Sequence, residues 1–288
     1  MNPTRPFHPY LMLLPTALLL AVFFFYPLFV AAKTSLTRWD LLTPASYVGL
    51  SHYAELVHSG ELFELFGRTL VFSVIVVLGA GGAGLALAVA LDRPGRFPAF
   101  CRSAVFSAYV VSWVSVALLW LWVLDAQAGV LNRTLAAAGL HPPDWLGDPR
   151  WALFALAGVT IWKITGYATV LFLAGLQDVP PSVLEAAALD GASPMARFRR
   201  ITWPLLGPTT AFVTITSLIL SFQVFDVVRV MTQGGPVRST TLMVYAIYEE
   251  VFMNLRVGRA SALVVAFFTA LMLLTSLELW IFSKRRAL

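Results

Sequence analysis

Charge and cysteine are both scarce in this sequence. Of its 288 residues only 12% are charged, while 59% are hydrophobic. In a typical soluble domain about a quarter of the residues are charged. The single cysteine, Cys101, excludes an internal disulfide and a cysteine-based metal site. The composition therefore favours a membrane protein over a soluble domain.

Lysine and histidine are also rare, which limits the possible enzyme classes. None of the three lysines, Lys33, Lys163 and Lys284, follows a Gly-x-x-x-x-Gly pattern, so we expect no ATP hydrolysis by the chain itself. The histidines lack metal-binding spacing, and we interpret His52 and His58 as solvated loop residues. No Gly-x-Ser-x-Gly nucleophile motif occurs. No enzymatic activity, cofactor or metal site is expected.

The net charge of +5 does not indicate a nucleic-acid partner. The basic residues are scattered beside apolar runs, as in the flanks of membrane helices, and do not form a block. The partner that this pattern predicts is membrane lipid.

Six apolar runs are each long enough to cross a bilayer, which requires roughly 20 residues. In lipid a segment must satisfy its own backbone hydrogen bonds, so each run predicts a helix. The chain is thus expected to be an all-α membrane protein, with residues 1–288 forming a single transmembrane domain. The first run exceeds the roughly 7–15 residues of a signal-peptide core, so we interpret it as an uncleaved span. The expected spans are 11–32, 69–91, 103–124, 152–176, 205–225 and 260–282.

Small residues recur in the second span at Gly79, Ala80, Ala83, Gly84 and Ala88. Such spacing lets neighbouring helix backbones approach closely. We interpret this stripe as a helix-packing surface and not as a binding site.

Basic residues predict the orientation, because Lys and Arg concentrate in cytoplasmic segments. Six spans place both termini on one side, and the density of basic residues marks this side as cytoplasmic. Most of the signal comes from 93–102 and from the tail 284–286. The long loops 33–68 and 226–259 are then external.

The segment between the fourth and fifth spans, 177–204, contains clear helix signals. Ser182 followed by Glu185 fits a capping box, so a short helix is expected to begin at Ser182. Asp190 and Gly191 are expected to end it, with a positive φ at the glycine.

A second short helix is expected directly afterwards. Ser193 is suited to cap it and Pro194 to occupy its first position. The helix is expected to end before Pro204. The segment 177–204 is therefore predicted to form a helix, a sharp turn and a second helix at the cytoplasmic face.

This segment resembles the signature loop of inner-membrane permeases in binding-protein-dependent ABC importers. In that family the loop supplies the coupling helix that docks in a cleft of the ATPase. Trp203 departs from the aliphatic residue usual before the final proline, which leaves the details of docking open. The residues that the resemblance assigns to ATPase coupling are Glu185, Ala186, Ala187, Asp190, Gly191, Ile201 and Pro204.

Other segments resemble the carbohydrate-uptake branch of the family. The resemblance extends over the residues 47–53, 162–163, 174–177 and 225–236, and includes the maltose-type and glycerol-phosphate-type importers. It implies a permease subunit forming half of a translocation path, with alternating access, in the bacterial inner membrane. The implied partners are a second homologous permease, two ATP-binding subunits and an extracytoplasmic solute-binding protein.

Polar residues inside the spans mark a possible solute path, because such residues are costly in lipid and usually face a cavity or a partner. A sugar also needs aromatic faces for its C–H surface. Two alternatives remain open: Lys163 pairs with an acid of a neighbouring helix, and Asp226 is an interfacial residue in water. The candidates for the path are Lys163, Thr165, Tyr167, Phe222, Gln223, Phe225 and Asp226.

Two other functional classes fit the sequence less well. A membrane-embedded transferase acting on lipid-linked substrates needs paired acidic or metal-binding residues near the membrane surface, whereas the acids here are spread through loops. A scaffold or an ion channel does not account for the coupling-loop pattern.

Overall fold

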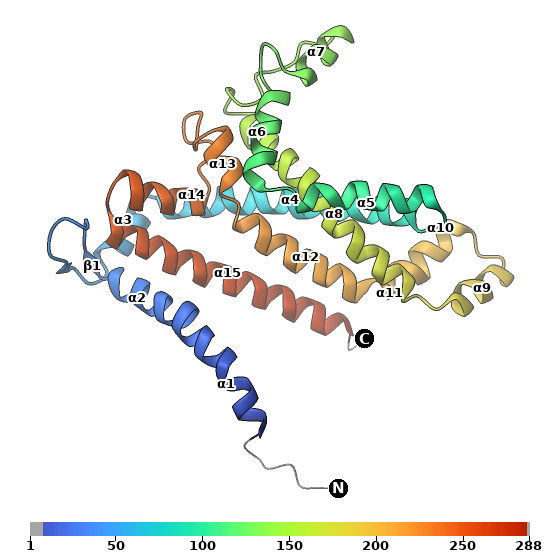
Figure 1. Ribbon diagram of the computed structural model, residues 1–288, viewed down its shortest axis with the longest axis horizontal. Coiled ribbons are helices and arrows are strands. Elements are labelled where there is room, and N and C mark those ends of the chain that lie inside the picture. Colours follow the sequence, from blue (N-terminus) through green and yellow to red (C-terminus); the bar gives the residue numbers. More distant parts are fainter. Residues whose placement is uncertain (1–7, 287–288) are drawn as a thin grey trace. The chain divides into compact units, whose positions relative to one another are not determined.

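The computed structural model describes residues 8–286, and the side chains of 12–282 (Figure 1). Arg5 and the basic side chains of the tail 284–286 lie outside the described residues. The chain divides into two compact units, Met1–Glu64 with Ala246–Ala270, and Leu65–Tyr245 with Leu271–Leu288. The fold is almost entirely helical, as predicted.

The first unit contains the N-terminal span and a small structured cap. The span is helical throughout, with a π-helical turn that ends two residues before Pro27. Proline lacks an N–H and its ring clashes within an α-helical turn, so a wider turn relieves the conflict. Two short strands pair antiparallel, with Thr37 opposite Tyr47. The elements are α1 (His8–Leu20), η1 (Ala21–Phe25), α2 (Tyr26–Thr34), β1 (Thr37–Arg38), β2 (Ser46–Tyr47), α3 (Ser51–His58) and η3 (Glu249–Met253).

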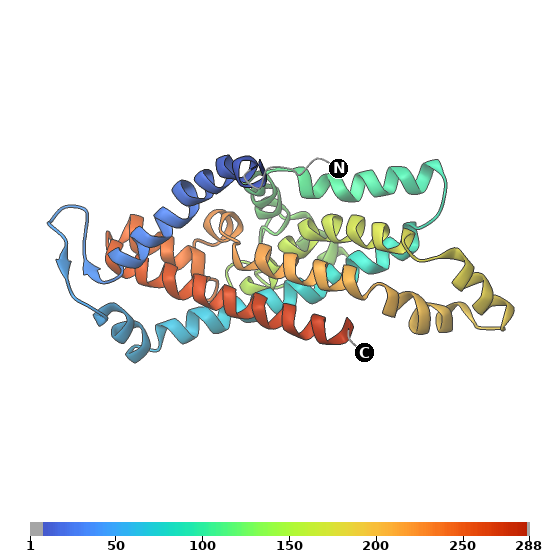
Figure 2. The ribbon, with the colours of Figure 1, turned by 90° about the horizontal axis from the view of Figure 1, so that it is seen from below.

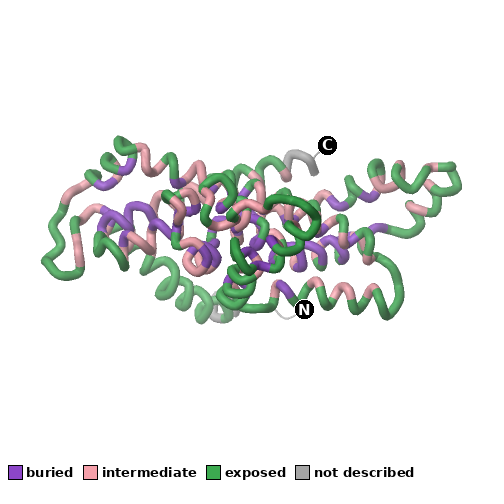
Figure 3. The backbone as a smooth tube through the Cα atoms, turned by 90° about the horizontal axis from the view of Figure 1, so that it is seen from above, coloured by how far each residue is buried: buried purple, intermediate pink, exposed green. Residues whose placement is uncertain are grey.

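The second unit is built around α8 (Ala152–Gln177), which is the most buried of its long helices (Figure 3). Its core joins α4 (Glu61–Leu91), α8 and α12 (Gly207–Phe222) through Ala88, Phe172 and Val213. The remaining elements of this unit are α5 (Arg96–Val110), α6 (Trp113–Val123), α7 (Val130–Ala137), α9 (Pro181–Leu189), α10 (Pro194–Arg197), η2 (Phe198–Thr202), α11 (Trp203–Leu205), α12 (Gly207–Phe222) and α13 (Asp226–Met231). Three helices begin in one unit and end in the other: α4 (Glu61–Leu91), α14 (Met243–Tyr248) and α15 (Val257–Arg286).

Five helices of the described residues are long and apolar enough to cross a membrane, which agrees with five of the predicted spans. The third span, predicted over 103–124, is wrong as a continuous helix. α5 ends at Val110, α6 begins at Trp113, and the two helices meet at an angle of 101° (Figure 1). Counted as one broken span, the pair gives the expected six.

The small residues of the second span pack against α8, which confirms their predicted role. A Cβ atom added to Gly79 would lie 2.5 Å from Cδ1 of Ile161, and one added to Gly84 would lie 2.6 Å from Cβ of Ala168. α4 and α8 therefore approach closely because these positions carry no side chain.

The solvated environment predicted for His52 is wrong, because its side chain is buried in the first unit. Its Nε2 lies 3.1 Å from the carbonyl oxygen of Thr37 in β1. Gly258, at the start of α15, approaches the same two groups, and a Cβ added there would lie 2.9 Å from Nε2. The loop 33–68 is therefore packed in this region and not merely hydrated.

Candidate functional site

The first helix of the segment 177–204 begins earlier than predicted. α9 has Pro180 at its N-cap and Pro181 in its first turn, and the side chain of Ser182 makes no capping hydrogen bond. The capping box is therefore wrong. The fixed φ of a proline suits the first helical position and starts the helix ahead of the serine.

The end of α9 agrees with the prediction. Gly191 has a φ of +77°. The N–H of Gly191 donates to the carbonyl of Ala188 at 3.1 Å, and the N–H of Ala192 donates to that of Ala187 at 3.0 Å. This pair of bonds is the Schellman arrangement, which requires a left-handed residue at the glycine. Gly191 thus reverses the chain within two residues.

The second helix begins as predicted, with the backbone N–H of Ala196 donating to Oγ of Ser193 at 3.3 Å. Its predicted end before Pro204 is wrong. Helical structure continues through Leu205, because the π-helical turn η2 precedes Pro204. The wide turn avoids the clash that a proline ring makes in an α-helix.

α9 has no buried residue, and only two of its nine positions are half-buried (Figure 3). Leu189 is 91% exposed and Val183 42%, and Glu185 also lies on the surface. Ile201 is half-buried and Pro204 is exposed. A short helix with large uncovered apolar side chains is typical of a contact surface for a partner protein.

Lys163 lies inside the second unit and is only 1% exposed. Its ammonium nitrogen donates to carbonyl oxygens of Ala108, Tyr109 and Val111 at the end of α5. It also lies 4.8 Å from the centre of the Trp113 ring. The buried charge is therefore held by backbone dipoles and an aromatic face.

The other two candidates on α8 differ in exposure. Thr165 is buried, and its hydroxyl donates to the carbonyl of Ile161 at 2.7 Å. Tyr167 is half-buried and stacks on Tyr109 of α5, with ring centres 5.0 Å apart and an interplanar angle of 24°. Of this pair, Tyr167 has surface available for a ligand.

The remaining candidates surround the break between α12 and α13. Phe222 is buried and packs near Phe66, with ring centres 6.4 Å apart. Gln223 is exposed at the end of α12, and Asp226 begins α13 and is half-buried. Phe225 lies 6.3 Å from the Tyr245 ring, centre to centre. α8 packs against both α12 and α13, so the two groups of candidates belong to adjoining helices.

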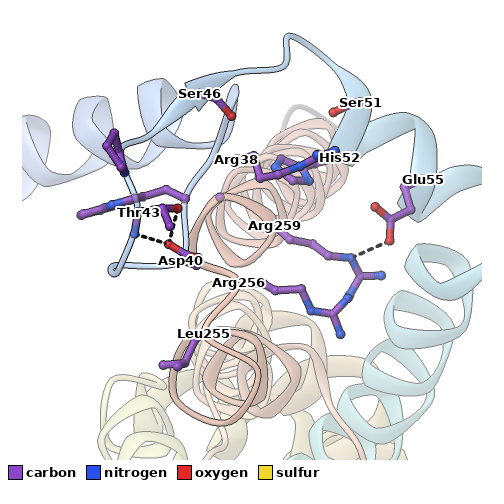
Figure 4. A pocket seen from close by; sticks show the side chains of 13 residues that line it. Arg38, Asp40, Thr43, Ser46, Ser51, His52, Glu55, Leu255, Arg256 and Arg259 are labelled. Carbon is purple, nitrogen blue, oxygen red and sulfur yellow. Dashed lines mark hydrogen bonds and ion pairs between the residues drawn. The ribbon is translucent and has the colours of Figure 1, made fainter.

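A polar pocket of about 360 Å³ lies within the first unit, between β1, β2, α3 and the start of α15 (Figure 4). On one wall Asp40 accepts from the backbone N–H of Thr43 at 2.7 Å and from that of Leu42 at 3.0 Å. These bonds, with that from the Thr43 hydroxyl, lower the pKa of Asp40 below its ordinary value. The carboxylate therefore stays ionised and holds the turn.

The opposite wall contains an ion cluster that the sequence analysis missed. Arg259 is buried, and its guanidinium contacts Glu250 at 2.7 Å, Glu61 at 2.5 Å and Glu55 at 3.3 Å. Arg256 also pairs with Glu250, at 3.3 Å. The sequence offered one signal for this cluster, which is the arginine at the start of the last apolar run.

The chain matches the family described as "Binding-protein-dependent transport system inner membrane component" over residues 5–286. The sn-glycerol-3-phosphate transport system permease protein UgpA of Agrobacterium fabrum is 33% identical, with 96% of this chain and 95% of that protein covered. The sulfoquinovosyl glycerol transport system permease protein SmoG of the same organism is 32% identical, with 93% and 88% covered.

A solved structure of similar fold is that of a bacterial ABC transporter involved in the import of the acidic polysaccharide alginate. It has a TM-score of 0.81 and 23% identity, with 96% of this chain and 94% of that chain covered. The family match places the chain among transport permeases and not among enzymes, and the solved structure agrees in fold. The chain belongs to the family of inner-membrane components of binding-protein-dependent transport systems.

Proposed function

We propose that the chain is one of two permease subunits of an ATP-driven importer for a sugar or sugar-like solute. The observation that supports this proposal most is full-length similarity to permeases named for sn-glycerol-3-phosphate and for sulfoquinovosyl glycerol. The solute is of the oligosaccharide, disaccharide or glycerol phosphate class. The whole chain acts as one transmembrane domain, beside a homologous permease and with a solute-binding protein outside the membrane.

The segment 177–204 is the proposed contact with the ATPase subunits. Its support is the uncovered apolar surface of α9, together with the Gly191 turn that fixes the direction of this helix. When the ATPase subunits close on ATP, the contacts of α9 with them change. A conformational change requires such a difference in contacts between two states. In the proposal this segment lies in the cytoplasm. With two spans after it and four before it, both termini are then cytoplasmic as well.

The proposed solute path runs between α8 and the α12–α13 break. Gln223 and Asp226 offer hydrogen-bonding groups, while Tyr167 and Phe225 offer aromatic faces. Thr165 and Phe222 are buried and pack behind the residues that face the proposed path. Polar groups of a membrane segment are most favourable where they face such a path.

Uptake measurements test the proposed function. The chain is reconstituted with its partner permease, ATPase and binding protein, and uptake of labelled disaccharides, oligosaccharides and polyol phosphates is measured with and without ATP. ATP-dependent uptake of at least one of these solutes is expected. Transport confined to amino acids or metal ions would contradict the sugar class.

Two substitutions test the path itself. Gln223→Ala and Asp226→Ala are expected to raise the apparent KM or to change the order of preference among solutes, because each removes hydrogen-bonding groups. Asn132→Ala serves as a comparison outside the path, since Asn132 is bonded to Ala126 and Trp145. Unchanged kinetics and selectivity in both path variants would place the solute elsewhere.

A further inference from the structure

The break between α5 and α6 leaves backbone carbonyls without helical partners. The last helical bond of α5 runs from the N–H of Val111 to the carbonyl of Ser107, at 3.3 Å. Val111 itself is extended, with a ψ of 143°. The carbonyls of Ala108 and Tyr109 therefore receive no donor from a following turn. In a membrane segment each such group is costly unless another partner reaches it.

The ammonium group of Lys163 is the missing partner of these carbonyls, although it lies 52 to 55 residues further along the chain. Its ammonium donates to the carbonyl of Ala108 at 3.2 Å, to that of Tyr109 at 3.0 Å, and also to that of Val111. An ammonium has three N–H groups, so all three are used. A cation is also favourable at the negative end of a helix dipole. This side chain is matched to the broken end of α5 and has no donor left for a solute.

The same face of α8 fits α5 in shape. Gly166 lies one helical turn from Lys163, and a Cβ atom there would collide with the carbonyl of Val105 and approach the Cα of Phe106 to 3.1 Å. Figure 2 shows α5 running alongside α8. The absence of a side chain at Gly166 permits the approach that brings the ammonium to the carbonyls.

We infer that Lys163 is a positioning residue for transport, which caps the broken end of α5 and thereby holds Tyr109 against Tyr167. Tyr109 is the connecting residue, because its carbonyl is bound by Lys163 and its ring stacks on Tyr167 at 5.0 Å. Non-helical backbone at membrane depth is tolerated where it is buried in protein or lines a cavity. The exposed break at Val111 and Ser112 therefore belongs to the wall of the path or to the contact with the second permease.

This inference rests on the proposed solute path, since Tyr167 is one of its residues. The primary variant is Lys163→Met, which keeps the length of the side chain and removes its donors. Thr169→Val is the matched control, because Thr169 is also buried in α8 but bonds only the carbonyl of Thr165, at 2.8 Å. Both variants are prepared in the full transporter complex, and the amount of assembled complex is measured first.

Two readouts are then compared. For solute uptake, Lys163→Met is expected to raise the apparent KM by about tenfold, the scale of one hydrogen bond to a charged group, because only the loss at Tyr109 reaches the path. For local structure, Ser112→Cys in a Cys101→Ser background is labelled by a small thiol reagent. Lys163→Met is expected to change its labelling rate several-fold, while a probe at Ala137→Cys in α7 keeps its rate. Lys163→Arg, which retains the charge, is expected to recover part of both effects.

Unchanged uptake kinetics together with unchanged labelling at position 112 would overturn the inference. An equal rise in KM for Thr169→Val would also overturn it, because any buried polar change in α8 would then suffice. If Lys163→Met does not assemble, the labelling comparison is made with Lys163→Gln, which removes the charge and one donor, and an unchanged rate at 112 in that variant counts against the role. The labelling does not require a known solute, so it decides the inference even if no sugar is transported.

Discussion

Arg259 and Glu250 form a buried ion pair in which Nη1 of the arginine donates to Oε1 of the glutamate at 2.7 Å. Their side chains are only 7% and 8% exposed. The guanidinium also binds Glu61 and Glu55, so one arginine joins α3, the start of α4, η3 and the start of α15 within the first unit. These elements are connected through charge and not only through apolar packing.

Replacing Arg259 with methionine is expected to destabilise this unit strongly. Breaking one partner of a buried ion pair typically costs about 3–5 kcal/mol, because the other charge remains buried without its partner. Thermal unfolding in detergent measures the effect, and adding Glu250→Gln is expected to recover part of the loss. Arg150→Met is the control, since Arg150 is 84% exposed in its pair with Asp148. Equal stability of the Arg259 and Arg150 variants would contradict the structural role of the cluster.

Gly166→Ala is expected to weaken the packing of α5 on α8. The added methyl group collides with the backbone of Val105, and such overpacking costs about 1–3 kcal/mol. Gly158→Ala tests the same change in the same helix at a position with open space around it, where no loss is expected. The half-life of thermal inactivation compares the two variants. A parental half-life for Gly166→Ala would mean that α5 and α8 can move apart to admit a methyl group without a loss of stability.

Gly191→Val is expected to uncouple ATP hydrolysis from transport. A β-branched residue is disfavoured at a φ of +77° by roughly 1 kcal/mol or more. A Cβ at this position has open space around it, so the penalty comes from the backbone and not from a collision. Gly191→Asn is the control, because asparagine tolerates the left-handed conformation. The ratio of solute transported to ATP hydrolysed should fall for valine and stay near parental for asparagine. Normal coupling in an assembled valine complex would exclude this role for the turn.

Thiol labelling of intact cells tests the orientation. Cysteine is introduced at Leu189 or at Val237 in a Cys101-free background, because these side chains are 91% and 89% exposed. An impermeant reagent is expected to label position 237, in the proposed external loop, and to label 189 only after the cells are opened. The reverse pattern would place the termini outside the cytoplasm.

The spans and the Gly191 turn were predictable because their causes are local. A run of about 20 apolar residues is sufficient to indicate a membrane helix. A glycine after a short helix is likewise sufficient to indicate a left-handed C-terminal turn, and Gly191 has the expected φ. The functional prediction rested on the resemblance of 177–204 to a known permease loop, and that resemblance also consists of local sequence signals. The residues proposed for ATPase coupling and for the solute path remain predictions.

Contacts between distant residues decided the features that the sequence analysis missed. The run 103–124 has no proline or glycine to mark a break, and the bend at Val111 is held by Lys163, more than 50 residues away. His52 is buried because Thr37 and the side-chain-free Gly258 meet around it. Apolar length and turn residues therefore determined the positions of five of the spans and the turn after α9. Only the tertiary structure decided which buried polar groups meet, because the partner of a charge in lipid is set by packing across the chain and not by its neighbours in sequence.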